Sequence, residues 1–259
     1  MEIFLQADTW IALLTLTFLE VVLGIDNIIF ISIASNKLPE NQQKKATRIG
    51  LLLAMIFRIL LLLGVSYLIS MKDPIWNIDL SWLKVGVTGQ SLILFAGGIF
   101  LLYKSTSEIH HKVEGRDEAH ASGNPKKRAT LLNVITQIVL IDIVFSFDSV
   151  LTAVGMTNGI QGALMIMIIA VIVSILIMLM FATPISNFVN KHPTIQMLAL
   201  SFLILIGFML ITESAHLSHT IVFGQSVGAI PKGYLYFAIT FSLLVEMLNM
   251  KMRGNSKKH

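Results

Sequence analysis

Two pairs of acidic residues lie in strongly apolar stretches of the chain, and the two pairs share one spacing. The pairs and the small polar residues that follow them are Glu20 and Asp26 with Asn27, and Asp142 and Asp148 with Ser149. Each residue of the second group follows its counterpart by 122 positions. A carboxylate at the centre of a membrane span costs a few kcal/mol. Four of them therefore require compensation by protons, by a bound cation or by an arginine.

The residue types indicate which cation such a site would bind. Residues seven apart share one face of a helix, which aligns Glu20 with Asn27 and Asp142 with Ser149. Asp26 lies about 100° around the helix from that face. Cysteine is absent, so thiolate ligands are excluded. Oxygen ligands favour hard divalent cations such as Mg²⁺, Ca²⁺ or Mn²⁺. Further neutral oxygens are available from Gln137, Ser146 and Thr152.

Other charged residues in apolar sequence are candidates for a counter-ion or a gate. Arg58 is the only basic residue at comparable depth, and we expect it to neutralise one carboxylate at most. Gln137 is a further candidate, and Glu213 and Glu246 lie near the ends of apolar runs, where a vestibule site and snorkelling to the interface are equally good interpretations. The competing interpretation of the whole set is structural: the carboxylates would only hold helices together. Helix contacts in membranes more often use Ser, Thr, Asn or Gln.

Composition places these motifs in a membrane protein. The chain has 259 residues, of which 55% are hydrophobic and 13% are charged. A span of the bilayer needs about 20 apolar residues. Apolar runs of that length predict an all-α membrane protein with seven transmembrane helices, at about 9–34, 48–70, 86–104, 131–155, 160–182, 195–212 and 233–251. The fifth is expected to end near Pro184, because proline disfavours further helix.

The basic residues predict the orientation of these spans. Fifteen Lys and Arg residues fall after the first, third, fifth and seventh spans, whereas only Lys72, Lys84 and Lys232 fall on the other side. Cytoplasmic loops carry an excess of Lys and Arg. We therefore expect a multi-pass protein of the cell (inner) membrane, with its amino terminus outside and its carboxyl terminus in the cytoplasm. The basic residues show no stripe with interleaved aromatics, so no nucleic-acid partner is expected.

The repeated acidic motif predicts the domain organisation. The second motif lies three spans after the first, an odd number, so the two copies run in opposite directions. Gly98 with Gly207 and Lys104 with Glu213 correspond more weakly. We expect two inverted three-helix repeats plus a C-terminal helix, with a transport site near the midplane. The predicted divisions are residues 1–104, a charged cytoplasmic loop at 105–130, residues 131–219, and a seventh helix with its basic tail at 220–259.

The loop at 105–130 contains His110, His111 and His120 among acidic residues. Metal sensing is one interpretation of this composition, since His and carboxylates suit transition metals. A solvated linker of mixed charge is the plainer one.

Motif content narrows the reaction class. The chain lacks a nucleotide-binding loop and a convincing nucleophile–base pair, so we expect neither ATP-driven pumping nor an enzyme. No cofactor is expected. A secondary carrier that works by alternating access fits better, with H⁺ as a coupling ion, because crowded carboxylates in low dielectric exchange protons for metal. The expected partners are the lipid bilayer and a divalent metal ion, with a homodimer left open.

The two motifs resemble the paired signature motifs of the TerC family of integral membrane proteins. The resemblance covers nearly the whole chain, through Arg48-Ile-Gly-Leu, Arg58, His192-Pro193, the run at 198–207, Glu213-Ser214 and the stretch from Pro231. It implies a three-plus-three repeat carrier of the lysine-exporter superfamily that exports manganese. It also implies that the acids at 20, 26, 142 and 148 and the amide at 27 form the metal site.

Two other functions remain open at this point. One is an exporter of amino acids or other small solutes, as the wider superfamily suggests, for which Arg58 is the only cationic partner available. The other is a membrane assembly or scaffold factor in which the carboxylates are structural.

Overall fold

The structure is a computed structural model that describes residues 7–114, 130–157 and 159–256, without the side chains of Leu23, Ile25, Asp26 and residues 254–256. In these ranges, seven helices are long and apolar enough to cross a membrane, which confirms the predicted number and class. They are α1 (Ala7–Ser35), α2 (Glu40–Leu63), α4 (Gly89–Val113), α5 (Leu131–Met156), α6 (Ala163–Lys191), α7 (Pro193–Leu217) and α8 (Lys232–Ser256). A short helix, α3 (Val65–Ser70), follows α2 after Gly64.

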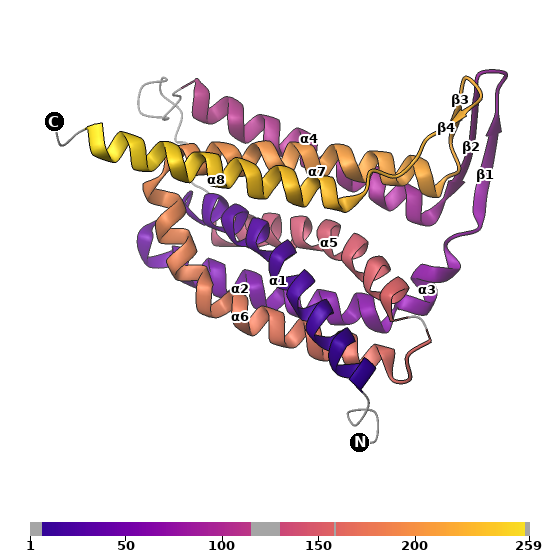
Figure 1. Cartoon of the computed structure of the whole chain (residues 1–259), viewed down its shortest axis with the longest axis horizontal. Helices are drawn as coiled ribbons and strands as arrows, with labels where there is room; N and C mark the ends of the chain where they lie inside the picture. The colour runs from indigo at the N-terminus through magenta and orange to yellow at the C-terminus, as the bar shows by residue number, and fades with distance from the viewer. Residues whose placement is uncertain (1–6, 115–129, 158, 257–259) are drawn as a thin grey trace. The chain divides into compact units, whose positions relative to one another are not determined.

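The chain forms two compact units, which we describe separately. Unit 1 comprises Met1–Asp73 and Gly123–Asn190 and therefore contains α1, α2, α3, α5 and α6. Unit 2 comprises Pro74–Ser122 and Lys191–His259 and contains α4, α7, α8 and all four described strands. Figure 1 labels these elements. Each unit thus combines helices from both predicted repeats.

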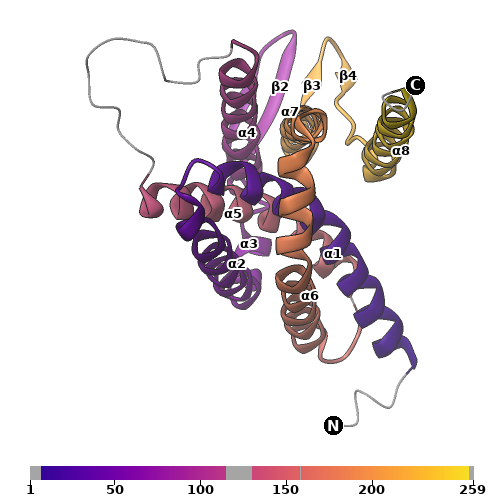
Figure 2. The same ribbon diagram turned by 90° about the vertical axis from the view of Figure 1, so that its left-hand side faces the viewer.

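Unit 1 is built on the packing of α1, α2 and α5. Gly50 of α2 permits a close approach, because a Cβ built there would lie 2.8 Å from Cγ2 of Ile138 on α5. α1 runs obliquely across the other helices of the unit (Figures 1 and 2). The carboxyl end of α1 meets α6 through polar side chains: Ser32 Oγ lies 2.8 Å from Ser186 Oγ and donates to Asn190 Oδ1 at 3.0 Å. Polar groups of this kind hold membrane helices together, because in lipid there is no hydrophobic driving force for helix association.

Unit 2 is built on a close crossing of α4 and α7. A Cβ at Gly98 would lie 2.7 Å from the carbonyl oxygen of Gly207, and a Cβ at Gly207 would lie 3.0 Å from that of Gly98. Small residues let transmembrane helices approach in this way. Ser214 Oγ also donates to the Ser91 carbonyl at 2.6 Å. These two glycines are the pair predicted as repeat counterparts, and here they face each other. The inverted relation of the repeats stays a prediction.

A small antiparallel sheet caps one end of α4 and α7. It comprises β1 (Pro74–Asp79), β2 (Leu83–Thr88), β3 (Ile221–Val222) and β4 (Gln225–Ser226), in the order β1-β2-β3-β4. The strands extend beyond the helix ends (Figure 1). The Gly86 N–H donates to the Ser218 carbonyl at 2.8 Å, and Thr88 caps the amino terminus of α4 in a capping box with Ser91. The sheet therefore lies at the amino terminus of α4 and at the carboxyl terminus of α7.

The boundaries differ from the prediction in several places. The predicted second span at 48–70 is two helices, since α2 begins at Glu40 and ends at Leu63, and α3 follows Gly64. The sheet was not expected, and the predicted third span began inside β2, because residues 83–88 are apolar enough to extend the run. The prediction that the fifth span ends near Pro184 was wrong, since α6 continues through Pro184 to Lys191. Membrane helices tolerate proline when neighbouring groups satisfy the freed carbonyl.

The predicted loop at 105–130 also begins later than expected. α4 reaches Val113, so His110 and His111 lie on a helix, while His120 lies outside the described residues. Side-chain pairs one turn apart support the extension: Lys104 Nζ forms an ion pair with Glu108 Oε1 at 2.9 Å, and His110 Nε2 lies 3.2 Å from Glu114 Oε2. Such pairs stabilise a helix by about 0.2–0.5 kcal/mol each.

We predict that Gly98→Ala destabilises the protein by about 1–3 kcal/mol, because the new methyl group would overlap backbone that cannot move freely. Gly155→Ala is the matched control, since a Cβ on this helical glycine of α5 meets nothing within 4 Å and gains helix propensity. Thermal denaturation in detergent compares the two. Equal stability of both variants would contradict the close crossing of α4 and α7.

Candidate functional site

A cluster of buried charged and polar side chains lies inside unit 1, between α1, α2 and α5. Its members are Glu20, Asn27, Arg58, Asp142 and Ser146, each at most 6% exposed. The same helices bury apolar residues close by in sequence, such as Ile28, Leu62 and Ile141. A buried charge is tolerated only when it is paired and hydrogen-bonded. The contacts within the cluster therefore decide what it does.

Arg58 joins both acidic motifs. Its Nη2 donates to Asp142 Oδ1 at 2.7 Å and its Nε donates to Asp142 Oδ2 at 3.2 Å. Its Nη1 forms a short ion pair with Glu20 Oε2. Arg58 thus contacts two carboxylates, while its single positive charge still offsets only one negative charge, in line with the expectation that it neutralises one carboxylate at most. The planar guanidinium presents several N–H groups in different directions, so one side chain can bond two carboxylates at once.

Asp142 is the most heavily bonded member of the cluster. Besides the two bonds from Arg58, Asn27 Nδ2 donates to Oδ1 at 2.8 Å and Ser146 Oγ donates to Oδ2 at 3.0 Å. Each carboxylate oxygen thus accepts two hydrogen bonds. An ionised carboxylate offers about four lone-pair positions in all. The described donors therefore fill the acceptor capacity of Asp142.

Helix geometry explains why these residues meet. Glu20 and Asn27 lie seven residues apart on α1, on one face as the spacing predicted, where Glu20 contacts Arg58 of α2 and Asn27 contacts Asp142 of α5. Asp142 and Ser146 lie one turn apart on α5, so the hydroxyl reaches the carboxylate directly. Arg58 projects from the buried side of α2, together with Gly50, Leu51, Ala54 and Leu62. Three helices are needed to complete the cluster.

The remaining predicted site residues are placed differently. Ser149 is buried on α5, but its hydroxyl donates to the Ser146 carbonyl of its own helix at 3.3 Å. Asp148 is half-buried on α5, one turn before Thr152, whose hydroxyl donates to the Asp148 carbonyl at 3.0 Å. Asp26 lies on α1, and its side chain is outside the described part of the structure. Its predicted role therefore stays a prediction.

The predicted gate residues divide between the units. Gln137 is half-buried on α5 of unit 1, and its Oε1 is enclosed without a hydrogen-bond partner in the described part of the chain. Glu213 lies on α7 and Glu246 on α8, so both belong to unit 2. No joint role with the cluster of unit 1 follows from these positions.

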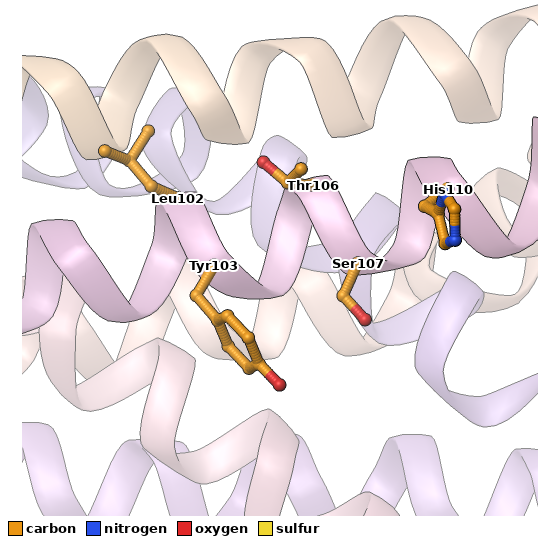
Figure 3. Close-up of a pocket in the computed structure, with 5 residues that line it drawn as sticks. All are labelled: Leu102, Tyr103, Thr106, Ser107 and His110. Atoms are coloured by element: carbon orange, nitrogen blue, oxygen red, sulfur yellow. The ribbon is translucent and has the colours of Figure 1, made fainter.

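A separate hollow of about 450 Å³ runs along α4 of unit 2 (Figure 3). Its lining residues all come from α4 and are Leu102, Tyr103, Thr106, Ser107 and His110. Figure 3 shows them spread along one helix rather than converging on a point. The lining is largely apolar and contains no carboxylate, so this hollow does not suit a hard cation.

The cluster of unit 1 offers oxygen ligands to a metal ion. Within the ranges that the structure covers, no three His, Asp or Glu side chains gather around one point. The cluster contributes two carboxylates, the Asn27 amide and the Ser146 hydroxyl, all of them hard oxygen-bearing groups. A cage of four carboxylates needs Asp26 and Asp148 as well, and this arrangement stays a prediction.

Comparisons with known proteins give a family for the chain. The model of the integral membrane protein TerC family matches residues 5–259. A UPF0053 protein of Haemophilus influenzae is 42% identical over 246 residues, which cover 95% of both chains. The UPF0053 inner membrane protein YoaE of Escherichia coli K12 is 43% identical over 259 residues, and the UPF0053 protein YegH of the same strain is 44% identical over 260.

The lengths of these relatives differ. The alignments include all of this chain but only 46% of YoaE and 45% of YegH, so the chain spans a little under half the length of these two proteins. No solved structure matches the chain.

We predict that Asp142→Ala lowers the free energy of unfolding by about 3–5 kcal/mol, because it removes four hydrogen bonds and leaves part of the Arg58 guanidinium buried without its partner. Asp79→Ala is the control. It breaks an ion pair with Lys84 at 3.3 Å in which both side chains are more than half exposed, and such pairs contribute at most about 1 kcal/mol. Unfolding in a denaturing detergent measures both. A loss for Asp142→Ala no larger than that for Asp79→Ala would contradict the described cluster.

Proposed function

Because the chain belongs to the TerC family of integral membrane proteins, we propose that it is a secondary transporter that exports a divalent metal cation, Mn²⁺ before others, across the cytoplasmic membrane. The support within the molecule comes from the buried cluster of unit 1. Manganese in particular rests on the family resemblance of the two acidic motifs. The cluster by itself favours a hard cation.

The observation that carries the proposal is an excess of buried acid. Glu20 and Asp142 bring two negative charges into the helix packing, and Arg58 brings one positive charge. Asp148 on α5 and Asp26 on α1 add two further acidic residues within six positions of the cluster. Intramembrane ionisable residues usually mark ion pathways, since their burial is expensive. An excess of carboxylate over guanidinium is suited to attract a cation.

The chemistry of the ligands supports a hard cation. Carboxylate, amide and hydroxyl oxygens are the groups that bind Mg²⁺, Ca²⁺ and Mn²⁺, whereas thiolates and thioethers bind softer ions. The Asn27 amide and the Ser146 hydroxyl each carry an oxygen that can turn towards a bound ion. The methionines that approach the cluster's helices, such as Met178 against Gly24, serve as packing groups.

Export also requires an energy source. Moving a divalent cation outward against 100 mV, negative inside, costs about 4.6 kcal/mol, twice the value for one charge. We propose H⁺ as the coupling ion, because the carboxylates that bind the metal can take up protons after releasing it. Proton entry would then accompany metal exit.

Localisation and orientation follow from the same proposal. YoaE is named as an inner membrane protein, and we place this chain in the inner membrane by similarity. The excess of Lys and Arg after odd-numbered spans supports an amino terminus outside and a carboxyl terminus in the cytoplasm. Two inverted repeats, exchanging access by a movement of helix bundles, are the expected transport mechanism.

One observation favours a second function. Asp142 is fully hydrogen-bonded by protein donors, which is also what a purely structural cluster would show. In that case the protein would act as a membrane assembly factor whose carboxylates only stabilise the packing of α1, α2 and α5.

Transport by the purified protein separates the two functions. Proteoliposomes are loaded with Mn²⁺, and efflux is followed for wild type, Asp142→Asn, Asp148→Asn and the surface control Asp79→Asn. Asparagine keeps the shape of each carboxylate and removes its charge. We predict that efflux falls by about tenfold or more in Asp142→Asn and Asp148→Asn and stays within about twofold of wild type in Asp79→Asn.

Folding is verified by size exclusion and helical circular dichroism. Two results would contradict the proposed function. One is wild-type efflux no faster than that from Mn²⁺-loaded liposomes without protein, and the other is unchanged efflux in folded Asp142→Asn and Asp148→Asn.

Coupling is tested separately with a pH gradient. In this test H⁺ enters the proteoliposomes from the external medium. We predict that acidifying this medium accelerates Mn²⁺ efflux, because proton uptake then replaces the metal on the carboxylates. The control applies the same gradient in the presence of a protonophore. Efflux that is independent of the gradient would exclude proton antiport and leave metal export itself unaffected.

A further inference from the structure

Asp142 has no acceptor position left for a metal ion in the described arrangement. Its two carboxylate oxygens accept bonds from Asn27, Ser146 and twice from Arg58. A metal ion binds through the same lone pairs that these donors use. At least one donor must therefore leave before Asp142 can bind a divalent cation.

The three donor residues differ in how they can release their hydrogen bonds to Asp142. Asn27 and Ser146 each have an oxygen, so a rotation about a side-chain bond converts either from a donor to the carboxylate into a ligand of the ion. Arg58 has only N–H donors and keeps its positive charge in proteins. Its guanidinium contacts both carboxylates of the cluster, Glu20 and Asp142. A divalent cation bound between these carboxylates would repel the guanidinium strongly at low dielectric.

We propose that Arg58 and the transported divalent cation alternate on the same two carboxylates, Glu20 and Asp142. Arg58 is then the internal counter-cation of the transport site. It leaves the carboxylates when the metal binds and returns when the metal departs. This inference rests on the proposed transport function and identifies the group with which the cargo competes.

The alternation gives Arg58 a role in the return step of the carrier. After release of the metal, two buried carboxylates would resist movement through apolar surroundings unless both charges are offset, one by Arg58 and the other by the coupling proton. Arg58 supplies a positive charge and three directed hydrogen bonds at that moment. Net export needs the carrier to return without cargo. Exchange of one metal ion for another needs no such return.

The acidic repeat lacks a second copy of this cation. The position 122 residues after Arg58 is Met180 on α6, which is 74% exposed. α6 has no Lys or Arg before Lys191 at its end. One guanidinium therefore serves acidic residues from both motifs, as its contacts with Glu20 and Asp142 show.

The test compares net efflux with exchange in proteoliposomes that contain radioactive Mn²⁺. Net efflux is measured into medium without Mn²⁺, and exchange is measured with equal unlabelled Mn²⁺ outside. The variants are wild type, Arg58→Met, Arg58→Lys and Arg48→Met. Arg48→Met is the matched control, since Arg48 also lies on α2 but is exposed. Methionine keeps the length of the side chain and removes its charge and donors.

We expect Arg58→Met to reduce net efflux by about tenfold or more and to keep exchange within about threefold of wild type. Arg48→Met should change neither rate by more than about twofold. Arg58→Lys keeps the charge but loses the fork of donors, so its net efflux should fall less than in Arg58→Met and more than its exchange.

Three outcomes overturn the inference. Unchanged net efflux in Arg58→Met would show that the carrier returns without this cation. An equal loss of efflux and exchange in folded Arg58→Met would show a structural role only. If Arg58→Met does not fold, equal losses in Arg58→Lys lead to the same conclusion. Failure of the proposed function is distinguishable, because wild type would then show neither efflux nor exchange.

Discussion

The pairing of one buried guanidinium with two buried carboxylates is the interaction on which unit 1 depends. Each charge alone would oppose insertion into apolar surroundings, and together with Asn27 and Ser146 they satisfy one another. The contacts come from α1, α2 and α5, so the ionic cluster fixes how these three helices pack. Gly50 of α2 allows the close approach that the arrangement needs.

In the proposed function, the same interaction connects stability with transport. A set of polar contacts that only held helices together would need no excess of acid, and neutral side chains would serve at lower cost. Here the carboxylates outnumber the guanidinium, and the polar neighbours of Asp142 include oxygens that can become ligands. Under this proposal, stabilisation of the packing and competition with a transported cation are two properties of one cluster. Membership of the TerC family is consistent with this account.

Much of this arrangement could be predicted from the sequence, and the limits have physical reasons. Length and hydropathy located all seven long helices, and the seven-residue spacing placed Glu20 and Asn27 on one face. The double pairing of Arg58 depends on the distance between α1 and α5, which only tertiary packing determines. Pro184 was interpreted as a helix end because local helix propensity takes no account of tertiary packing, whereas α6 continues through Pro184 to Lys191. The four-stranded sheet joins residues 74–88 with 221–226, a pairing that no local pattern reveals.

Equilibrium binding of Mn²⁺ to the purified protein tests the central claim most directly. The free ion is measured by its electron paramagnetic resonance signal during titration of wild type, Asp142→Asn and Glu20→Gln. The account predicts a saturable site in wild type whose affinity falls by about tenfold or more in each variant, since each removes a charged oxygen ligand from a buried site. Equal affinity in all three folded proteins would contradict the account, because the ion would then bind elsewhere.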